Sequence, residues 1–510
     1  MKKFRFMNML VAAALLTGFT ACSNEVDGIE SEAENPQDAN GYIKMSITVP
    51  NGAGGETRAN TNDESDDGTD VGTANEYAVK NVTLYLFKAN DLTYDTNYTG
   101  VFESSHEYTT ISDATDEATN KKVYTVTGKI KTGKYHVYVV VNGKATMSLT
   151  PGTTTEKNFL ADVNTTKYTG VVAPDDISSS GIQMASRTME STASYPYRTL
   201  EITSSNSSES AAAEMEVEVE RVMGRLTLKA KSANNSYDVN GSKGGKIATV
   251  EITNYKIVNP RNSFYTFRHT NTSSTGAVAD DTYGLAGTNY VMDPKTASKT
   301  LTGSTMANDY TSWYGTATAY AAMPTETSSK TVIGYCNENT IPQNNQVNGY
   351  STGVIFKAKV TPEAAYKLDG GTVKTGEAKD IADATVFYYN PESEKFYLSL
   401  EALNKDLNLS LTDETLHTYK IQKYQGGVCY YKYWIKHLPQ AGTTMGPMEF
   451  AIVRNNTYDM MVESVSGMGE GSTTNDVVIT PADPDKINDI YIKVTLKVMP
   501  WIVRTNNIIL

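Results

Sequence analysis

Histidine, cysteine and the common catalytic motifs are scarce in this chain of 510 residues. The five histidines and three cysteines form neither His-Glu-x-x-His nor Cys-x-x-Cys, the spacings that hold a metal ion. The Gly-x-Ser-x-Gly motif of serine hydrolases is also absent. The Gly-rich stretch 467–471 lacks the Gly-Lys-Ser/Thr of a phosphate-binding loop, so we interpret it as a turn. The sequence therefore predicts no metal, no cofactor and no enzyme.

Basic residues and long apolar runs are scarce as well. Lysine and arginine total 45 against 58 acidic residues, and the formal net charge is −13. Because the basic residues are also scattered, a nucleic-acid-binding surface is not expected. No apolar run approaches the roughly 20 residues that a membrane-spanning helix needs. Beyond the N-terminal segment only Cys336 and Cys429 remain, and they are compatible with a disulfide or with free core thiols.

Tyrosine, by contrast, is abundant: the chain has 33 tyrosines but 12 phenylalanines and three tryptophans. This composition is typical of a secreted β protein, since exposed strand faces favour tyrosine and threonine. Alternation of apolar and polar residues predicts strands at 79–87, 123–130, 135–141 and 215–222, and further strands are expected at the aromatic-rich stretch 428–437 and at 448–456. Leucines at helical spacing predict a helix over 399–407. The length allows two or three domains, and we place a boundary near residue 222.

Two stretches at opposite ends of the chain, 42–49 and 491–498, are near copies of each other. Both begin Tyr-Ile-Lys, both end in Val, and both alternate strictly, which predicts strands with one buried face. The apolar face carries Ile43, Met45, Ile47 and Val49 in the first copy and Ile492, Val494, Leu496 and Val498 in the second. Strands so alike could fill the same place in a sheet, which makes the second copy a candidate for insertion into another molecule. The alternative is that they are the ordinary first and last strands of a β protein.

Segment 51–79, which follows the first copy, is rich in glycine and acidic residues that disfavour both strand and helix. Arg58 is the only basic residue between Lys44 and Lys80. Because proteases cut exposed flexible loops, we predict cleavage between Arg58 and Ala59 by an Arg-specific protease. The alternative is an incidental surface arginine.

The N-terminal residues 1–22 have the pattern of a secretion signal. A positive start is followed by a short apolar core, which is too short to span a bilayer. The sequence Phe19-Thr20-Ala21-Cys22 resembles a lipobox, although Phe19 departs from the usual Leu. We therefore expect Cys22 to carry a lipid. The alternative is an ordinary signal peptide with a chance cysteine.

The order of these features resembles the fimbrillins, the major fimbrial subunits of type V pili in anaerobic Gram-negative bacteria. A lipoprotein-type signal precedes strand 42–49, the Arg58 loop and a strand at 82–87. The aromatic block 430–437, the block 445–456 and the pair Pro500-Trp501 are similar to the C-terminal region of the Mfa-type, or minor-fimbria, branch. The resemblance covers most of the chain, whereas 270–420 carries no matching motif.

The resemblance implies an all-β fold of two transthyretin-like β-sandwich domains with few short helices. It implies a signal peptide with lipobox at 1–22, a propeptide with a removable first strand at 23–58, sandwiches at 59–222 and 223–489, and a donor strand at 490–510. Trp501, just beyond the second copy, would lock that strand on its neighbour. The implied function is a shaft subunit that is exported as a lipoprotein, cleaved after an arginine and polymerised by donor-strand exchange, supporting adhesion.

The implied partners are further copies of the chain, anchor and tip proteins, the Arg-specific protease and, for the lipid-anchored precursor, the outer membrane. Neither nucleic acid nor a cofactor is implied. The alternative function is a surface-anchored glycan- or protein-binding lipoprotein, or a fimbrial anchor or tip that does not polymerise. A glycan reader should expose clustered aromatic residues, and outside 428–437 only Trp313 and Tyr314 are candidates.

Overall fold

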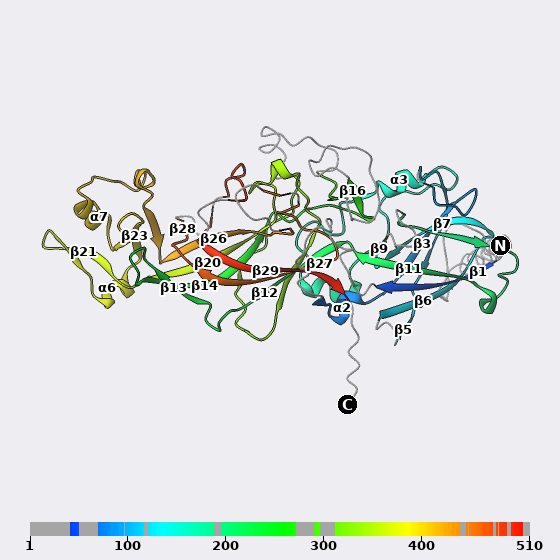
Figure 1. Ribbon diagram of the computed structural model, residues 1–510, viewed down its shortest axis with the longest axis horizontal. Coiled ribbons are helices and arrows are strands. Elements are labelled where there is room, and N and C mark those ends of the chain that lie inside the picture. The colour runs from blue at the N-terminus through cyan, green and yellow to red at the C-terminus, as the bar shows by residue number, and fades with distance from the viewer. Residues whose placement is uncertain are drawn as a thin grey trace, which may run out of the picture.

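The chain is built mainly from strands with a few short helices, and the molecule is elongated (Figure 1). The computed structural model describes residues 41–49, 70–95, 97–116, 121–187, 195–271, 290–295, 312–438, 445–446, 448–472, 476–477, 479–486 and 491–502. The all-β class is therefore confirmed, whereas the division into two transthyretin-like domains stays a prediction. Within the described ranges, no helix is both long enough and apolar enough to cross a bilayer.

The first sheet lies at one end of the molecule and has nine strands (Figure 1). They are β1 (Gly41–Val49), β3 (Val82–Lys88), β4 (Val101–Tyr108), β5 (Ser112–Asp116), β6 (Lys121–Ile130), β7 (Gly133–Val141), β9 (Met184–Ser186), β10 (Arg198–Ile202) and β11 (Ala213–Arg221). Their spatial order is β4-β3-β7-β9-β11-β1-β6-β5, with β10 beside β7. Apolar side chains of β1, β6 and β11 share one core with those of β3, β7 and β10. The sheet therefore folds over on itself, and the period-2 pattern gives each strand its buried face.

Two further sheets share a second core in the other half of the chain. The five-stranded sheet has, in spatial order, β19 (Thr331–Asn337), β12 (Met223–Lys229), β27 (Asn456–Val465), β29 (Ile492–Ile502) and β2 (Asp70–Val71). The six-stranded sheet has β13 (Ser236–Asn240), β14 (Lys246–Val258), β20 (Gly353–Pro362), β26 (Val428–Trp434) and β28 (Glu470–Gly471), with β18 (Ala321–Ala322) beside β14. Met460 and Ile492 of the five-stranded sheet and Phe356 and Tyr431 of the six-stranded sheet belong to this core.

The remaining elements are small. The end opposite the first sheet holds β22 (Thr372–Thr375), β21 (Ala365–Asp369), β24 (Lys395–Tyr397), β23 (Val386–Asn390) and β25 (Gln422–Gln425), in that order (Figure 1). Two short pairs join β8 (Val163–Asn164) to β15 (Phe264–Tyr265) and β16 (His269–Asn271) to β17 (Tyr290–Met292). The helices are α2 (Ala74–Tyr77), α3 (Glu156–Leu160), α4 (Ile177–Ser180), α6 (Ala378–Asp383) and α7 (Leu400–Leu407), and the 3-10 turns are η2 (Pro174–Asp176), η4 (Glu209–Ala211), η5 (Gln343–Asn345) and η6 (Leu416–Tyr419).

Most strands predicted from alternation are confirmed, with bounds that shift by a few residues. Segments 42–49, 79–87, 123–130, 135–141 and 215–222 correspond to β1, β3, β6, β7 and β11. The helix expected over 399–407 is α7, where the Ala402 N–H donates to the Ser399 hydroxyl at 3.1 Å. The strand expected at 448–456 is wrong. Met448 and Asn455 have positive φ angles of 56° and 58°, which turn the backbone, and β27 begins only at Asn456.

The chain passes from the nine-stranded sheet to the five-stranded sheet between β11 and β12, and buried ion pairs connect the two sides. The domain boundary expected near residue 222 stays a prediction. Glu76 of α2 pairs with Arg225 of β12 at 2.9 Å. Arg454 lies 2.7 Å from Glu338 and 3.9 Å from Glu220, the second of which belongs to β11. All five side chains are buried. The junction therefore contains charges that only a matching alignment of the two sides satisfies.

Cys336 and Cys429 lie on different strands of the second half of the chain. Cys336 is in β19 and Cys429 is in β26, and both thiols are buried and free. Of the two possibilities that the sequence left open, the structure therefore shows free core thiols.

Candidate functional site

The first strand copy, β1, is an inner strand of the first sheet, between β6 and β11 (Figure 1). It pairs antiparallel with β6 along its whole length and parallel with β11 from Ile43 to Thr48. Because both edges of β1 are paired, its removal would leave unpaired backbone groups on two facing walls.

The apolar face of β1 is buried completely. Ile43 is 1% exposed, and Met45, Ile47 and Val49 are 0% exposed. They share a core with side chains of both neighbouring strands and of β3 and β7. On the outer face, Lys44 forms an exposed ion pair with Glu214 at 3.0 Å. We call the space that β1 fills the β1 slot; it accepts a strand with four apolar side chains at every second position.

The second copy, β29, belongs to a different sheet and occupies a different kind of position. It pairs antiparallel with β27 along its length, with one register shift. On its other side, the described residues pair with it only at Asp70 and Val71 of β2, opposite Trp501 and Ile502. For most of its length β29 is therefore an edge strand within the part of the chain that is described.

The burial of β29 is also less complete than that of β1. Ile492 is 3% exposed, but Val494 and Leu496 are only half-buried, and Tyr491 just before the strand is exposed. The backbones of Val498 and Trp501 lie in β29, whereas their side chains are outside the described part. The same apolar pattern is thus better covered in the β1 slot than on β29.

The predicted processing residues cannot be placed relative to these strands. Cys22, Arg58 and Ala59 lie outside the described residues. The described chain stops at Val49, the end of β1, and resumes at Asp70 in β2. The segment with Arg58 therefore links the strand that fills the slot to the strand that pairs with the end of β29.

The sequence did not reveal which strands form the walls of the β1 slot. Val126 of β6 and Met215 of β11 stand opposite Met45, one on each side. Both segments were predicted as strands, but alternation does not name a pairing partner. The Lys44–Glu214 contact joins residues 170 positions apart. In the described part of the chain, no group of three His, Cys, Asp or Glu side chains could hold a metal ion.

Two family models match the chain at its two ends. The model described as "Major fimbrial subunit protein (FimA)" matches residues 43–221, which run from β1 to the end of β11. The model described as "Major fimbrial subunit protein type IV, Fimbrillin, C-terminal" matches residues 422–507, which include β29. The matches therefore contain both the slot and the second strand copy.

Sequence relatives that are named fimbrial subunits agree with these family-model matches. Two sequences of the minor fimbrium subunit Mfa1 of Porphyromonas gingivalis are 22% and 23% identical over 489 residues, 93% of this chain and 88% of each relative. Among solved structures, the tip fimbrial protein Mfa3 of Porphyromonas gingivalis with a C-terminal truncation is 12% identical, with a TM-score of 0.36 over 90% of this chain and 100% of that chain. The assignment rests on the sequence matches. The chain belongs to the Mfa-type branch of the fimbrillin family, the subunits of cell-surface fimbriae.

Proposed function

We propose that this chain is a shaft subunit that polymerises head to tail by donor-strand exchange. One observation carries the proposal: two copies of one strand pattern occupy unequal positions. β1 fills a fully buried inner slot, whereas β29 lies at an edge and is only partly covered. Once β1 has left, β29 of a neighbouring subunit supplies the same side chains to the empty slot.

Removal of β1 requires a cut in the segment that ties it to the rest of the chain. In this proposal the precursor is exported as a lipoprotein, and the lipid on Cys22 holds it at the outer membrane. Cleavage between Arg58 and Ala59 then detaches residues 22–58 together with the lipid on Cys22. The mature subunit consists of the domains 59–222 and 223–489 and of the donor segment 490–510. Residues 41–49 are then held only by noncovalent contacts and are free to be displaced.

The exchange improves both the burial and the hydrogen bonding of the donor. At a constant offset, Ile492, Val494, Leu496 and Val498 take the places of Ile43, Met45, Ile47 and Val49. Full burial of four such side chains stabilises the joint by about 6–12 kcal/mol before ordering costs, less what β29 already gains on its own sheet. In the slot, both edges of the strand are hydrogen-bonded to neighbouring strands, whereas on its own sheet β29 has only one edge that is paired along most of its length. Each additional backbone hydrogen bond contributes roughly 0.5–1.5 kcal/mol.

The cut also loosens the far end of β29. β2 covers Trp501 and Ile502, and before cleavage it is tied through the Arg58 segment to the fixed strand β1. After cleavage, β2 belongs to a free N-terminal segment that is held at this point by two residue pairs. A single cleavage therefore allows β1 to be displaced from the slot and weakens the contact that retains the donor.

The joint links two different surfaces, so it repeats without closing and builds a filament rather than a ring. Each subunit offers one slot and one β29, and Trp501 extends the contact along the neighbour. A filament of this kind needs an anchor at one end and a tip at the other, which are the further partners we propose. The fibre would then present the subunit surface to host or bacterial partners and support adhesion.

The test compares the purified precursor before and after treatment with an Arg-specific protease on an unboiled denaturing gel. We expect a ladder only after cleavage, with Ala59 as the new N-terminal residue. Arg58→Ala should remain monomeric because its slot stays filled. Deletion of 490–510 should give a folded, cleaved monomer, since the acceptor is open but no donor exists. A ladder from either variant would falsify the proposal, and a cleaved wild-type chain that stays monomeric would favour an anchor, a tip or a binding lipoprotein.

A further inference from the structure

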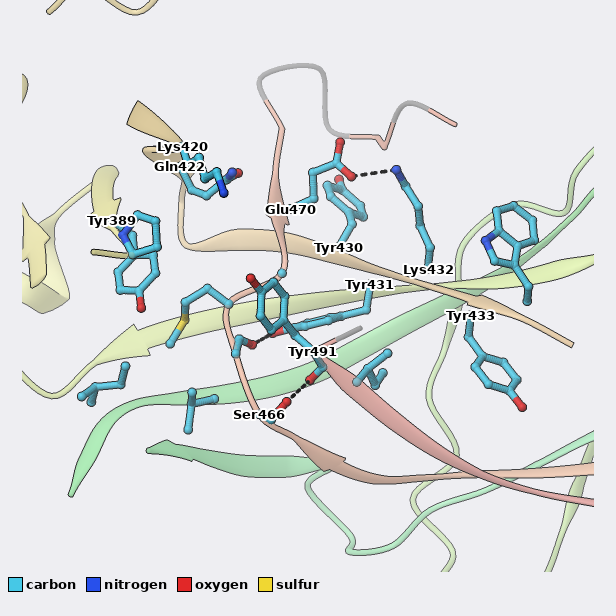
Figure 2. Close-up of a pocket in the computed structure, with 18 of the residues that line it drawn as sticks. Tyr389, Lys420, Gln422, Tyr430, Tyr431, Lys432, Tyr433, Ser466, Glu470 and Tyr491 are labelled. Carbon is cyan, nitrogen blue, oxygen red and sulfur yellow. Dashed lines mark hydrogen bonds and ion pairs between the residues drawn. The ribbon is translucent and has the colours of Figure 1, made fainter. Parts of the chain in front are cut away.

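A groove of about 780 Å³ opens beside β26, where the 466–470 loop, the residue before β29 and the small end sheet meet (Figure 2). Of the residues that line it, Tyr491 and Ile492 belong to the proposed donor segment, and the others play no part in the proposed strand exchange. Its volume lies within the range of about 300–1,000 Å³ that is usual for small-molecule sites. The groove therefore needs an explanation of its own.

Aromatic rings dominate the wall of this groove. They are Tyr389, Tyr430, Tyr431, Tyr433, Trp434, Phe450 and Tyr491, contributed by β23, β26, the turn at 448–450 and the residue before β29. Tyr491 is 45% exposed and packs on Gly467, where a Cβ atom would lie 2.2 Å from the Tyr491 Cδ1. The Tyr431 hydroxyl donates to the Gly467 carbonyl at 3.0 Å and fixes the same loop. Tyr491 is thus an accessible ring on a firmly held support.

The charges of the wall largely cancel. The charged residues that line the groove are Glu394, Lys420, Lys432, Lys436, Glu470 and Asp485. Lys432 pairs with Glu470 at 2.8 Å on the rim (Figure 2), and Lys436 lies 3.4 Å from the buried Glu449. Burial raises the pKa of the Asp485 carboxyl to about 8, so at neutral pH this group is mostly protonated and uncharged. With Asp485 uncharged, three lysines and two glutamates of the wall remain charged. Glu449 offsets the charge of Lys436 from outside the wall, so a strongly anionic or cationic ligand would find little net countercharge.

We propose that this groove binds a neutral oligosaccharide. The C–H face of a sugar ring carries partial positive charge, which complements the negative face of an aromatic ring such as Tyr491. The sugar hydroxyls find donors and an acceptor in the Gln422 amide. An extended peptide fits less well, because β28 already pairs with the outer edge of β26 at Cys429 and Tyr430.

This inference goes beyond assembly: it assigns the fimbrial subunit a ligand class, in a groove formed mainly by the second half of the chain. The aromatic block 428–437, which the sequence marked only as a strand, supplies most of the rings. Trp313, one of the two aromatic candidates for glycan binding outside 428–437, is 1% exposed and packs on Tyr350. In the proposed exchange Tyr491 leaves the groove with β29, so the complete groove belongs to the unprocessed subunit. Its ligand can be tested there without polymerisation, and a failure leaves the strand-exchange proposal untouched.

The experiment titrates the purified unprocessed chain by calorimetry with maltohexaose, cellohexaose, chitohexaose and mannohexaose. A heparin hexasaccharide serves as the acidic probe and a hexapeptide of alternating valine and threonine as the peptide probe. The variants are Tyr491→Ala, Tyr491→Phe and Gln422→Ala. Tyr94→Ala is the matched control, because Tyr94 is 36% exposed, stacks on Tyr195 and lies on the first half of the chain.

We expect saturable binding of at least one neutral hexasaccharide, and weaker binding of the heparin and peptide probes. Loss of the Tyr491 ring should weaken the affinity about tenfold, as an aromatic contact of about 1.4 kcal/mol requires. Tyr491→Phe and Tyr94→Ala should bind as the wild type does, and Gln422→Ala should bind more weakly. The proposal is overturned if no neutral probe binds at millimolar concentration, if the acidic or peptide probe binds best, or if Tyr491→Ala and Gln422→Ala both leave the affinity unchanged.

Discussion

At the scale of single residues, the two strand copies differ in the residue that precedes them. Gly41 stands before the first copy and Ile490 before the second. A Cβ atom at Gly41 would lie 2.2 Å from the Ile202 Cγ2, so the first position of the slot has no room for a side chain. A donor that enters in the matching register brings Ile490 against Ile202, and either Ile202 moves or the donor leaves the strand path before Tyr491.

This contact predicts an effect in the precursor. Gly41→Ile should overpack the start of β1 and lower the free energy of unfolding by roughly 1–3 kcal/mol, measured by urea denaturation of the uncleaved chain. Ile202→Ala in the same chain should recover much of the loss, because it removes the atoms that collide. An unchanged urea midpoint for Gly41→Ile would show that the Ile202 side chain moves aside at little cost. The donor would then enter without hindrance at this position.

At the scale of elements, β1 and β29 should respond differently to the same change. Met45 is fully buried, so Met45→Asp should prevent the precursor from folding, because an unpaired carboxylate would lie in the core. Val494 is half-buried at an edge, so Val494→Asp should leave a folded, cleavable precursor. The same variant should abolish the ladder, since Val494 takes the place of Met45 in the slot. Circular dichroism and unboiled gels of the cleaved chain measure the two effects.

Lys493→Ser is the matched control on the same strand. Lys493 is exposed and lies on the outer face, where it corresponds to Lys44 with its exposed ion pair to Glu214. Exposed pairs contribute little, about 0–1 kcal/mol, so this variant should assemble nearly as well as the wild type. A normal ladder from Val494→Asp, or loss of the ladder in Lys493→Ser, contradicts the assigned faces.

The sequence predicts a strand where one face of that strand is buried, but it does not predict which strands pair with each other. The alternation in 42–49 and 215–222 predicted β1 and β11, because period-2 burial leaves a direct mark on the residues. Their parallel contact depends on how distant segments pack, which no local pattern encodes. The strand expected at 448–456 failed for a related reason: its apolar residues pack from a turn, and positive φ at Met448 and Asn455 breaks the extended path. The aromatic block at 428–437 predicted β26, but not the groove that forms around it.

At the scale of the whole molecule, the proposed acceptor slot and the proposed donor strand β29 lie in different halves of an elongated chain (Figure 1). In a filament, the force on each joint would pass through the junction between β11 and β12. The buried pairs Glu76–Arg225 and Arg454–Glu220 join the two sides there. Such pairs add little net stability, yet leaving one charge unpartnered costs about 3–5 kcal/mol. They therefore favour one alignment of the two halves, which suits a subunit that must repeat regularly along a fibre.

The head-to-tail arrangement predicts a crosslink that moves from one chain to another. Met45 stands opposite Val126 in the antiparallel pairing of β1 with β6, and such pairs lie within disulfide distance, with Cα atoms about 4.5–5.5 Å apart. The uncleaved chain with Met45→Cys and Val126→Cys should therefore form a disulfide within one molecule. The cleaved chain with Val494→Cys and Val126→Cys should form disulfides between subunits, seen as a ladder on boiled, nonreducing gels.

The matched control pairs Val126→Cys with Thr495→Cys, the next residue of the donor, whose side chain faces the other side of the strand. It should polymerise after cleavage but should not crosslink, because a shift of one residue turns the thiol away from Val126. The native thiols of Cys336 and Cys429 are buried and should stay out of the reaction. If Val494→Cys crosslinks to Val126→Cys within a single chain, the strand folds back on its own subunit. If both donor positions crosslink equally, the register set by the two strand copies is wrong.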